Sequence, residues 1–215
     1  MSSSKSSVAP NTPIPTQEVT ATALRSLAVV NVNGDLQKLG PLMGNSKSIV
    51  IFMRHLGWPY CWAQANDWCS QIPLLQKNGI KGPFFISVGD VEKLDLFLEK
   101  NPNIPRDKMF IDTPSFDAYK SAGLGKMFKD KEKTLRGSKN FKAPALSFSG
   151  WRNYLSSASK FVNYDDKEFT LEVVTQLGAT FAVDGEEVVF AYDEGIPGDD
   201  PAPSVVIDYW LKNPN

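Results

Sequence analysis

The chain has few of the residues that build disulfide frameworks or metal sites: its 215 residues include two cysteines and one histidine. Cys61 and Cys69, eight positions apart, do not make a disulfide framework, which favours a reducing compartment such as the cytosol or the plastid stroma. His55 has no second histidine and no paired thiolates beside it, so a zinc site is not expected. We therefore predict a cytoplasmic protein without a metal or other cofactor, with the stroma as the alternative location.

The sequence also lacks long apolar runs and an excess of one charge. No run approaches the roughly 20 apolar residues that span a bilayer, and the N-terminus has no apolar secretory core. The 23 basic and 24 acidic side chains nearly cancel, and neither sign forms a long block. This balance argues against a nucleic-acid surface. The predicted partners are small molecules or other proteins, met in solution.

One domain with additions accounts for the length. Apolar residues make up 42% of the chain, which is enough for one substantial core. Residues 1–24 are rich in Ser, Thr and Pro and have no hydrophobic period, so they are predicted to be a disordered tail. Their Ser-rich, acid-poor composition also resembles the remnant of a transit peptide. Residues 25–215 form the predicted domain.

The order of strands and helices is legible from Leu27 onward. Asn33-Gly34 suits a tight turn, and the nearly continuous apolar run over 48–53 is typical of a strand covered on both faces. Pro73 should bend or end the helix that follows. In order, the pattern predicts a hairpin over 28–39, a strand over 48–53, a helix over 59–77, a strand over 83–88, a helix carrying Val91, Leu94, Phe97 and Leu98, a strand over 109–111, and a short helix ending at Gly123.

Residues 126–165 interrupt this alternation. The stretch 126–142 is basic and has no amphipathic period, which predicts an insertion. Its aromatic residues have no clear repeat and are expected to pack against the body: Phe148, Trp151, Tyr154 and Phe161.

The regular pattern returns after the insertion. Residues 179–192 read as a second hairpin around Asp184-Gly185, and 203–212 as a closing helix. That helix is expected to bury four residues: Val205, Val206, Tyr209 and Trp210. The whole order predicts an α/β, thioredoxin-like three-layer sandwich with an N-terminal hairpin and an insertion before the C-terminal hairpin.

Cys61 is the leading candidate for chemistry. It follows the break Gly57-Trp58-Pro59, where a strand gives way to a helix. A helix N-terminus carries about half a positive charge, which stabilises a thiolate and lowers the pKa of the thiol. Arg54 is the candidate that adds charge beside this thiol. The alternative is an inert, buried cysteine.

The remaining candidates have weaker arguments. Cys69 lies roughly 12 Å further along the same predicted helix and about 80° around it, too far for a disulfide with Cys61, so a structural role is expected. His55 is a possible base but a more probable structural residue. Arg152 becomes a second donor if the insertion folds over the site. Trp58 and Pro59 would form an apolar pocket wall or a docking surface for a protein.

Three segments carry a resemblance to a known family. They are Val-Ile-Phe-Met-Arg-His-Leu-Gly-Trp-Pro-Tyr-Cys over 50–61, Gln-Leu-Gly-Ala-Thr-Phe-Ala-Val over 176–183, and Gly-Asp-Asp-Pro over 198–201. Over about residues 27–213 the chain resembles the peroxiredoxin-like-2, or selenoprotein-U-like, family of the alkyl hydroperoxide reductase and thiol-specific antioxidant superfamily. The pattern of that family has Cys-x-x-Cys, with selenocysteine first in some members. Here Trp58 replaces the first residue and Cys61 keeps the second.

The resemblance leaves two function classes open. It implies a thiol antioxidant enzyme in which Cys61 attacks a peroxide or a protein disulfide and is restored by an external thiol. The peroxidatic motif Pro-x-x-x-Thr-x-x-Cys aligns with Cys61, but it places Arg54 at the Pro and Trp58 at the Thr. The second class is a catalytically degenerate binding module or complex subunit, with a protein partner on the Trp58 face.

Overall fold

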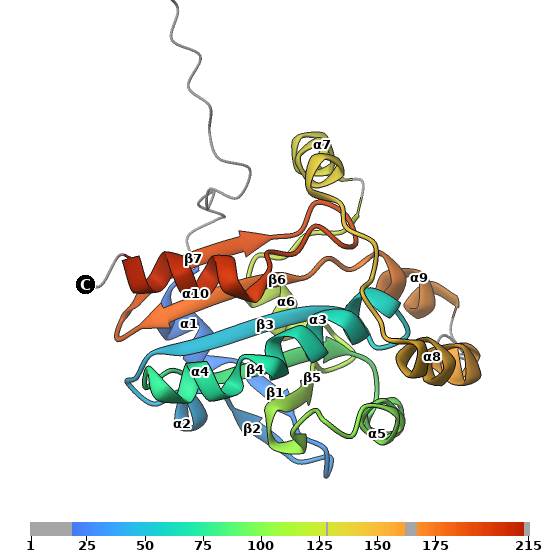
Figure 1. Ribbon diagram of the computed structural model, residues 1–215, viewed down its shortest axis with the longest axis horizontal. Helices are drawn as coiled ribbons and strands as arrows, with labels where there is room; N and C mark the ends of the chain where they lie inside the picture. The colour runs from blue at the N-terminus through green and yellow to red at the C-terminus, as the bar shows by residue number, and fades with distance from the viewer. Residues whose placement is uncertain (1–18, 128, 162–166, 213–215) are drawn as a thin grey trace, which may run out of the picture.

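A seven-stranded mixed sheet forms the centre of the computed structural model, which describes residues 19–127, 129–161 and 167–212 (Figure 1). The strands are β1 (Ala28–Val30), β2 (Leu36–Lys38), β3 (Ser48–His55), β4 (Lys81–Val88), β5 (Met109–Ile111), β6 (Ala179–Asp184) and β7 (Glu187–Asp193). The helices are α1 (Ala21–Ser26), α2 (Gly40–Met43), α3 (Pro59–Ser70), α4 (Ile72–Lys77), α5 (Val91–Lys100), α6 (Asp117–Ser121), α7 (Lys131–Asn140), α8 (Phe148–Phe161), α9 (Lys167–Thr175) and α10 (Pro203–Lys212), with a 3-10 turn at Arg106–Lys108.

The sheet has a parallel centre and an antiparallel hairpin at each edge. Its strand order is β2-β1-β5-β4-β3-β6-β7. β3 pairs in parallel with β4, and β4 in parallel with β5, while β6 joins β3 in the antiparallel sense. Both predicted hairpins are present, as β1–β2 and β6–β7. The predicted α/β sandwich is therefore confirmed.

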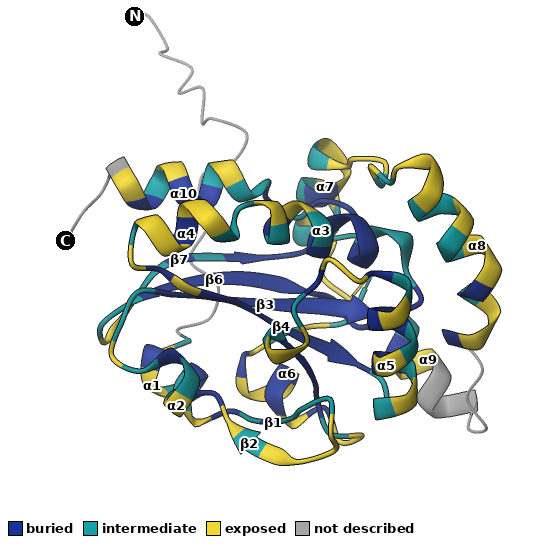
Figure 2. Ribbon diagram, turned by 60° about the horizontal axis from the view of Figure 1, so that its bottom comes forward, coloured by how far each residue is buried: buried dark blue, intermediate teal, exposed yellow. Residues whose placement is uncertain are grey.

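Strand β3 consists of a nearly continuous apolar run because both of its faces are buried. Its alternate residues enter two separate cores: Ile49, Ile51 and Met53 on one face, Val50 and Phe52 on the other. Helices α3, α4, α5 and α10 supply the first core, and α1, α2, α6 and α9 the second (Figure 2). A strand covered on both faces has no position for an exposed polar side chain. Within the described ranges no helix is long and apolar enough to cross a membrane.

The helix predicted over 59–77 is divided in two. α3 ends at Ser70, Gln71 follows, and α4 carries Pro73 in its first turn. Because proline lacks an N–H, it is tolerated in a first turn and excluded from a helix interior. The predicted break is confirmed, two residues before the proline.

Both ends of the domain differ in part from the prediction. Ala21 and Leu24, assigned to the tail, are buried residues of α1, whose N–H at Ala23 is capped by the Thr20 hydroxyl at 3.1 Å. The rest of the predicted tail, up to residue 18, lies outside the described residues. In α10 the buried residues are Val206, Ile207 and Trp210, whereas Val205 and Tyr209 are only half-buried.

The predicted insertion contains helices α7 and α8, which the lack of a clear period did not reveal. α7 is capped by the Asp130 carboxylate and buries only Gly137, so a local capping signal defines it more than an apolar face does. α8 is attached by aromatic contacts. Trp62 of α3 meets Tyr154 at 5.5 Å and Phe161 at 5.9 Å between ring centroids. The expected packing of Phe148 is wrong, because that side chain is 88% exposed.

Gly57 permits the close approach of α8 to the turn after β3. A Cβ at Gly57 would lie 2.8 Å from Cβ of Phe161, closer than two carbon atoms normally approach. The insertion is thus packed directly on the segment that leads into α3.

We predict that Phe161→Ala destabilises the domain by about 3 kcal/mol, because it leaves a cavity beneath α8. Phe148→Ala, in the same helix, should change the free energy of unfolding by no more than about 0.5 kcal/mol, since its ring is exposed. Urea unfolding of both variants measures the difference. Equal costs would show that α8 is not held by Phe161.

Candidate active site

The candidate site lies at the end of the sheet where the carboxyl ends of β3 and β7 lie; we call this end the active-site edge. Both strands are antiparallel to β6, so their carboxyl ends meet at the same edge. The register aligns Phe52 with Ala179 and Ala179 with Asp193 across the three strands. Residues just beyond Phe52 and Asp193 therefore come together, although about 140 positions separate them in the chain.

Cys61 is the third residue of α3 and is only 2% exposed. Its backbone N–H donates to the carbonyl of Trp58, the N-cap residue, at 3.0 Å. Cys61 and Cys69 lie in the same helix and are both free thiols, as the sequence predicted.

The predicted low pKa of the Cys61 thiol is wrong for this structure. Burial raises its pKa well above the ordinary value, and the nearby Glu194 carboxylate raises it further. Arg54 opposes both through its charge and a backbone hydrogen bond. Loss of water therefore outweighs the helix N-terminus. Burial also raises the pKa of the half-buried Cys69, to about 12, so both thiols are protonated in the folded protein at neutral pH.

Arg54 is a buried cation, 1% exposed, at the end of β3. Its Nη2 donates to the carbonyl of Val174 at 2.7 Å, and both terminal nitrogens lie 4.0 Å from Sδ of Met127. Its guanidinium carbon is 4.7 Å from the ring centroid of Trp58, a cation–π contact. Its Nε–H is buried and has no hydrogen-bond partner in the described part of the protein.

Trp58 covers Arg54 and is half-buried. Its indole N–H is a second buried donor that lacks a partner among the described residues. The ring centroids of Trp58 and Tyr60 are 6.2 Å apart, and those of Tyr60 and Phe141 are 6.1 Å apart. The three side chains therefore form a row of aromatic rings. Pro59 occupies the first turn of α3, where its missing N–H costs nothing.

His55 lies in the turn after β3, and Arg152 lies on the surface of α8. Nδ1 of His55 accepts the N–H of Gly57 at 3.1 Å, which fixes the turn. Burial first, and Arg54 second, lower its pKa to about 3, so the ring stays neutral. Arg152 is an exposed residue of α8. The insertion residue that reaches the turn is Tyr154, whose hydroxyl donates to the Gly57 carbonyl at 3.2 Å.

Glu194 is the site residue that the sequence did not reveal. It follows β7, is 4% exposed, and its Oε2 accepts the N–H of Gly178 at 3.1 Å. Burial raises its pKa to about 8, and Arg54 acts in the opposite direction. The only local signal was its place between the second hairpin and the Gly198-Asp199-Asp200 segment.

Comparison with known proteins identifies the family. The model of the AhpC/TSA antioxidant enzyme family matches residues 69–195, more than half of the chain. The chain belongs to the AhpC/TSA antioxidant enzyme family. The matched segment contains Glu194 but begins after Cys61.

Solved structures of AhpC/TSA relatives share the fold. Peroxiredoxin Q of Xanthomonas campestris is 14% identical, with a TM-score of 0.52 over 90% of this chain and 96% of that one. Peroxidoxin BcpB of Mycobacterium tuberculosis is 10% identical, with a TM-score of 0.50 over 85% of this chain and 88% of that one. At such low sequence identity, the structural match establishes the thioredoxin-like fold and no more. No curated protein sequence matches the chain.

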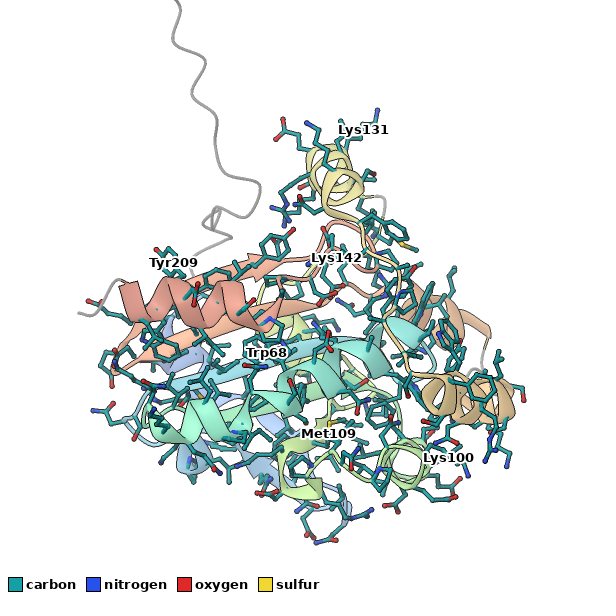
Figure 3. The ribbon with its side chains drawn as sticks, in the orientation of Figure 1. Trp68, Lys100, Met109, Lys131, Lys142 and Tyr209 are labelled. Atoms are coloured by element: carbon teal, nitrogen blue, oxygen red, sulfur yellow. The ribbon has the colours of Figure 1, made fainter. Side chains whose placement is uncertain are left out.

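A small cavity lies beside α3 in this AhpC/TSA domain, and its lining is more apolar than polar. It measures about 120 Å³, and its lining includes Tyr60 and Gln64, close to Cys61 in sequence, together with Trp68 and Lys142. Figure 3 labels the last two, Trp68 and Lys142. Cys61 itself is not part of its lining. Over the ranges that the structure describes, no three His, Cys, Asp or Glu side chains are grouped to hold a metal.

We predict that N-ethylmaleimide modifies Cys69 before Cys61 in the folded protein at pH 8. Both thiols have raised pKa values, so access decides, and Cys61 should react at least about tenfold more slowly. Peptide mass spectrometry over time measures the two rates, and labelling in denaturant should make them equal. Faster labelling of Cys61 in the native protein would mean that the first turn of α3 is open in solution.

Proposed function

We propose that the chain is a thiol-dependent peroxidase or disulfide oxidoreductase in which Cys61 is the nucleophile and Arg54 stabilises its thiolate. The observation that carries this proposal is a pair of buried N–H donors at the start of the helix that carries Cys61, Arg54 Nε and Trp58 Nε1, neither of which has an acceptor in the described protein. A buried donor without a partner costs about 1–3 kcal/mol, which a bound oxygen atom would recover.

These donors suit a peroxide. Cleavage of an O–O bond places negative charge on the leaving oxygen, and donors aimed at developing charge in a water-poor site lower the barrier. Arg54 is 1% exposed, so its charge is poorly screened. The missing Thr hydroxyl of the peroxidatic motif is thus replaced in this proposal by the Trp58 N–H.

The reaction balances without a metal or an organic cofactor. The Cys61 thiolate attacks the terminal oxygen of a hydroperoxide, the S–O bond forms as the O–O bond breaks, and the alkoxide leaves and takes up a proton. The resulting sulfenic acid condenses with an external thiol, releasing water and forming a mixed disulfide. A second external thiol cleaves that disulfide and restores Cys61.

An external reductant follows from the position of Cys69. Both cysteines belong to the continuous helix α3, with eight positions between them. A disulfide needs Cα atoms within about 7 Å, whereas eight residues of helix span roughly 12 Å. Cys69 therefore does not act as the resolving residue while α3 is intact.

A binding module is the second candidate, and the closed site favours it. Cys61 is 2% exposed, burial raises its pKa, and the Trp58 ring lies over Arg54. In that case the row of Trp58, Tyr60 and Phe141 would serve as a docking surface for a protein partner. Phe141 is 53% exposed, which suits such a surface.

Membership of the peroxiredoxin-like-2, or selenoprotein-U-like, branch is also proposed here. Its support is the placement of Trp58 at the N-cap and Cys61 three residues later, within one helical turn. This is the geometry that a Cys-x-x-Cys pair at a helix start requires. The unpartnered Trp58 N–H is consistent with a position built for a smaller side chain.

Turnover distinguishes the enzyme from the binding module. Cys61→Ser should abolish thiol-dependent peroxide consumption, whereas Cys69→Ser should keep it within about twofold of the wild type, since only the nucleophile is indispensable. Hydrogen peroxide and an alkyl hydroperoxide, each with an excess of a dithiol, are the substrates to assay. A wild-type protein no faster than Cys61→Ser would favour the binding module.

Trp58→Cys tests the proposed branch. The introduced thiol should form a reversible disulfide with Cys61, because the two positions lie within one turn at the helix start. Titration against a glutathione redox buffer measures its reduction potential. Trp58→Ala is the matched control, since it removes the same ring but adds no thiol. If the folded Trp58→Cys variant resists oxidation, position 58 is not the first redox position.

A further inference from the structure

The active-site edge holds one buried cation and two buried groups that can become anions. Arg54, Cys61 and Glu194 are 1%, 2% and 4% exposed, respectively. The contacts of the guanidinium in the described part of the chain are to the Val174 carbonyl, the Met127 sulfur and the Trp58 ring, none of which is an anion. Neither acidic group is thus in direct contact with the positive charge that each would need.

We propose that Glu194 and Cys61 compete for the positive charge of Arg54, so that Glu194 is a positioning residue that controls ionisation of the thiol. A single buried cation compensates one buried anion, and a second anion in the same low-dielectric volume is unfavourable. This inference rests on the proposed role of Cys61 as the reactive thiol.

The position of the Glu194 carboxyl group is fixed by Gly178. Its Oε2 accepts the Gly178 N–H at 3.1 Å, and its own backbone N–H donates to the Gly178 carbonyl at 3.0 Å. A Cβ at position 178 would lie 2.7 Å from Oε1 of Glu194 and 2.3 Å from the Phe52 carbonyl oxygen. Glycine is therefore the residue that lets this carboxyl group lie against β3, two residues before Arg54.

The electrostatic effects agree with a competition. Burial and Glu194 raise the pKa of Cys61, while Arg54 lowers it. Burial raises the pKa of Glu194 to about 8, and the charge of Arg54 lowers it. Each acid is stabilised as an anion by Arg54, and Glu194 disfavours the thiolate. The two ionisations are consequently linked.

Other charged groups lie around Glu194, and some of them are already paired. Asp200, whose pKa burial raises to about 6, and Asp199 both act on it from the segment before α10. From α7, Lys133 and Arg136 pair with Asp193, the residue before it. Also coupled to this site are Arg54 of β3, Cys61 of α3, Tyr119 of α6 and Tyr154 of α8, and burial raises the pKa of both tyrosines. Glu194, with a pKa of about 8, is a group of this cluster that titrates between pH 7 and 9.

The competition predicts a distinctive pH dependence. Below about pH 7, Glu194 holds its proton and Arg54 acts on the thiol alone. Above about pH 8, the Glu194 carboxylate is stabilised by that same charge, so the reactivity of Cys61 rises by less than the tenfold per pH unit of a single thiol well below its pKa. Glu194→Gln keeps an oxygen acceptor for Gly178 but carries no charge. It should match the wild type below pH 7 and react up to about tenfold faster at pH 9.

The test measures the rate at which methyl methanethiosulfonate modifies Cys61 between pH 6 and 9.5, in a Cys69→Ser background. Glu194→Gln is compared with Asp193→Asn, a neighbouring buried acid whose partners lie on α7. The proposal is supported if the modification rate of Glu194→Gln equals that of the wild type below pH 7 and exceeds it above pH 8, while Asp193→Asn shows no such difference. The proposal is overturned if the rates of Glu194→Gln and the wild type keep a constant ratio at every pH, or if Asp193→Asn shows the same increase above pH 8.

Two further measurements keep the test decisive. If Glu194→Gln does not fold, the wild-type profile still decides, because a uniform tenfold rise per pH unit up to pH 9 would overturn the competition. Peroxide consumption is measured separately on the same proteins. Absence of peroxide turnover with a normal pH gap in the methanethiosulfonate rate would reject the peroxidase function and leave the charge competition standing.

Discussion

Burial of the Arg54 charge is the constraint on which the candidate site depends. A guanidinium cannot lose its proton to escape a low-dielectric site, so the surrounding atoms must compensate it. The structure supplies the Val174 carbonyl, the face of Trp58 and, at longer range, the ionisable Glu194 and Cys61. Elements from both halves of the chain converge here because each contributes part of that compensation.

The sheet brings these groups together through its direction and register. β3 carries an unbroken apolar run that two helical layers cover, and this run ends at Arg54. β6 lies between β3 and β7, so the ends of the two outer strands share one edge. Strand pairing thereby places Glu194 beside a residue of the first half of the chain, with Gly178 as the point of contact.

Local patterns were sufficient for most of the fold. Continuous apolar runs, turn pairs such as Asn33-Gly34 and the position of Pro73 predicted the central strands, both hairpins and the break between α3 and α4. The acidity of Cys61 was not predictable in this way. Its burial depends on the core cluster packed around α3, and its electrostatic environment on Glu194, which lies about 130 positions further along the chain. Desolvation of this kind leaves no trace in the sequence around the thiol.

The contacts of α8 couple the insertion to the thiol. Tyr154 donates to the Gly57 carbonyl, and Phe161 packs against Trp62 and lies over Gly57. These contacts hold the turn that leads into the first turn of α3, where Cys61 lies. The stability of the insertion is therefore linked to that of the segment that carries the thiol, although no residue of α8 is close to Cys61 in the sequence.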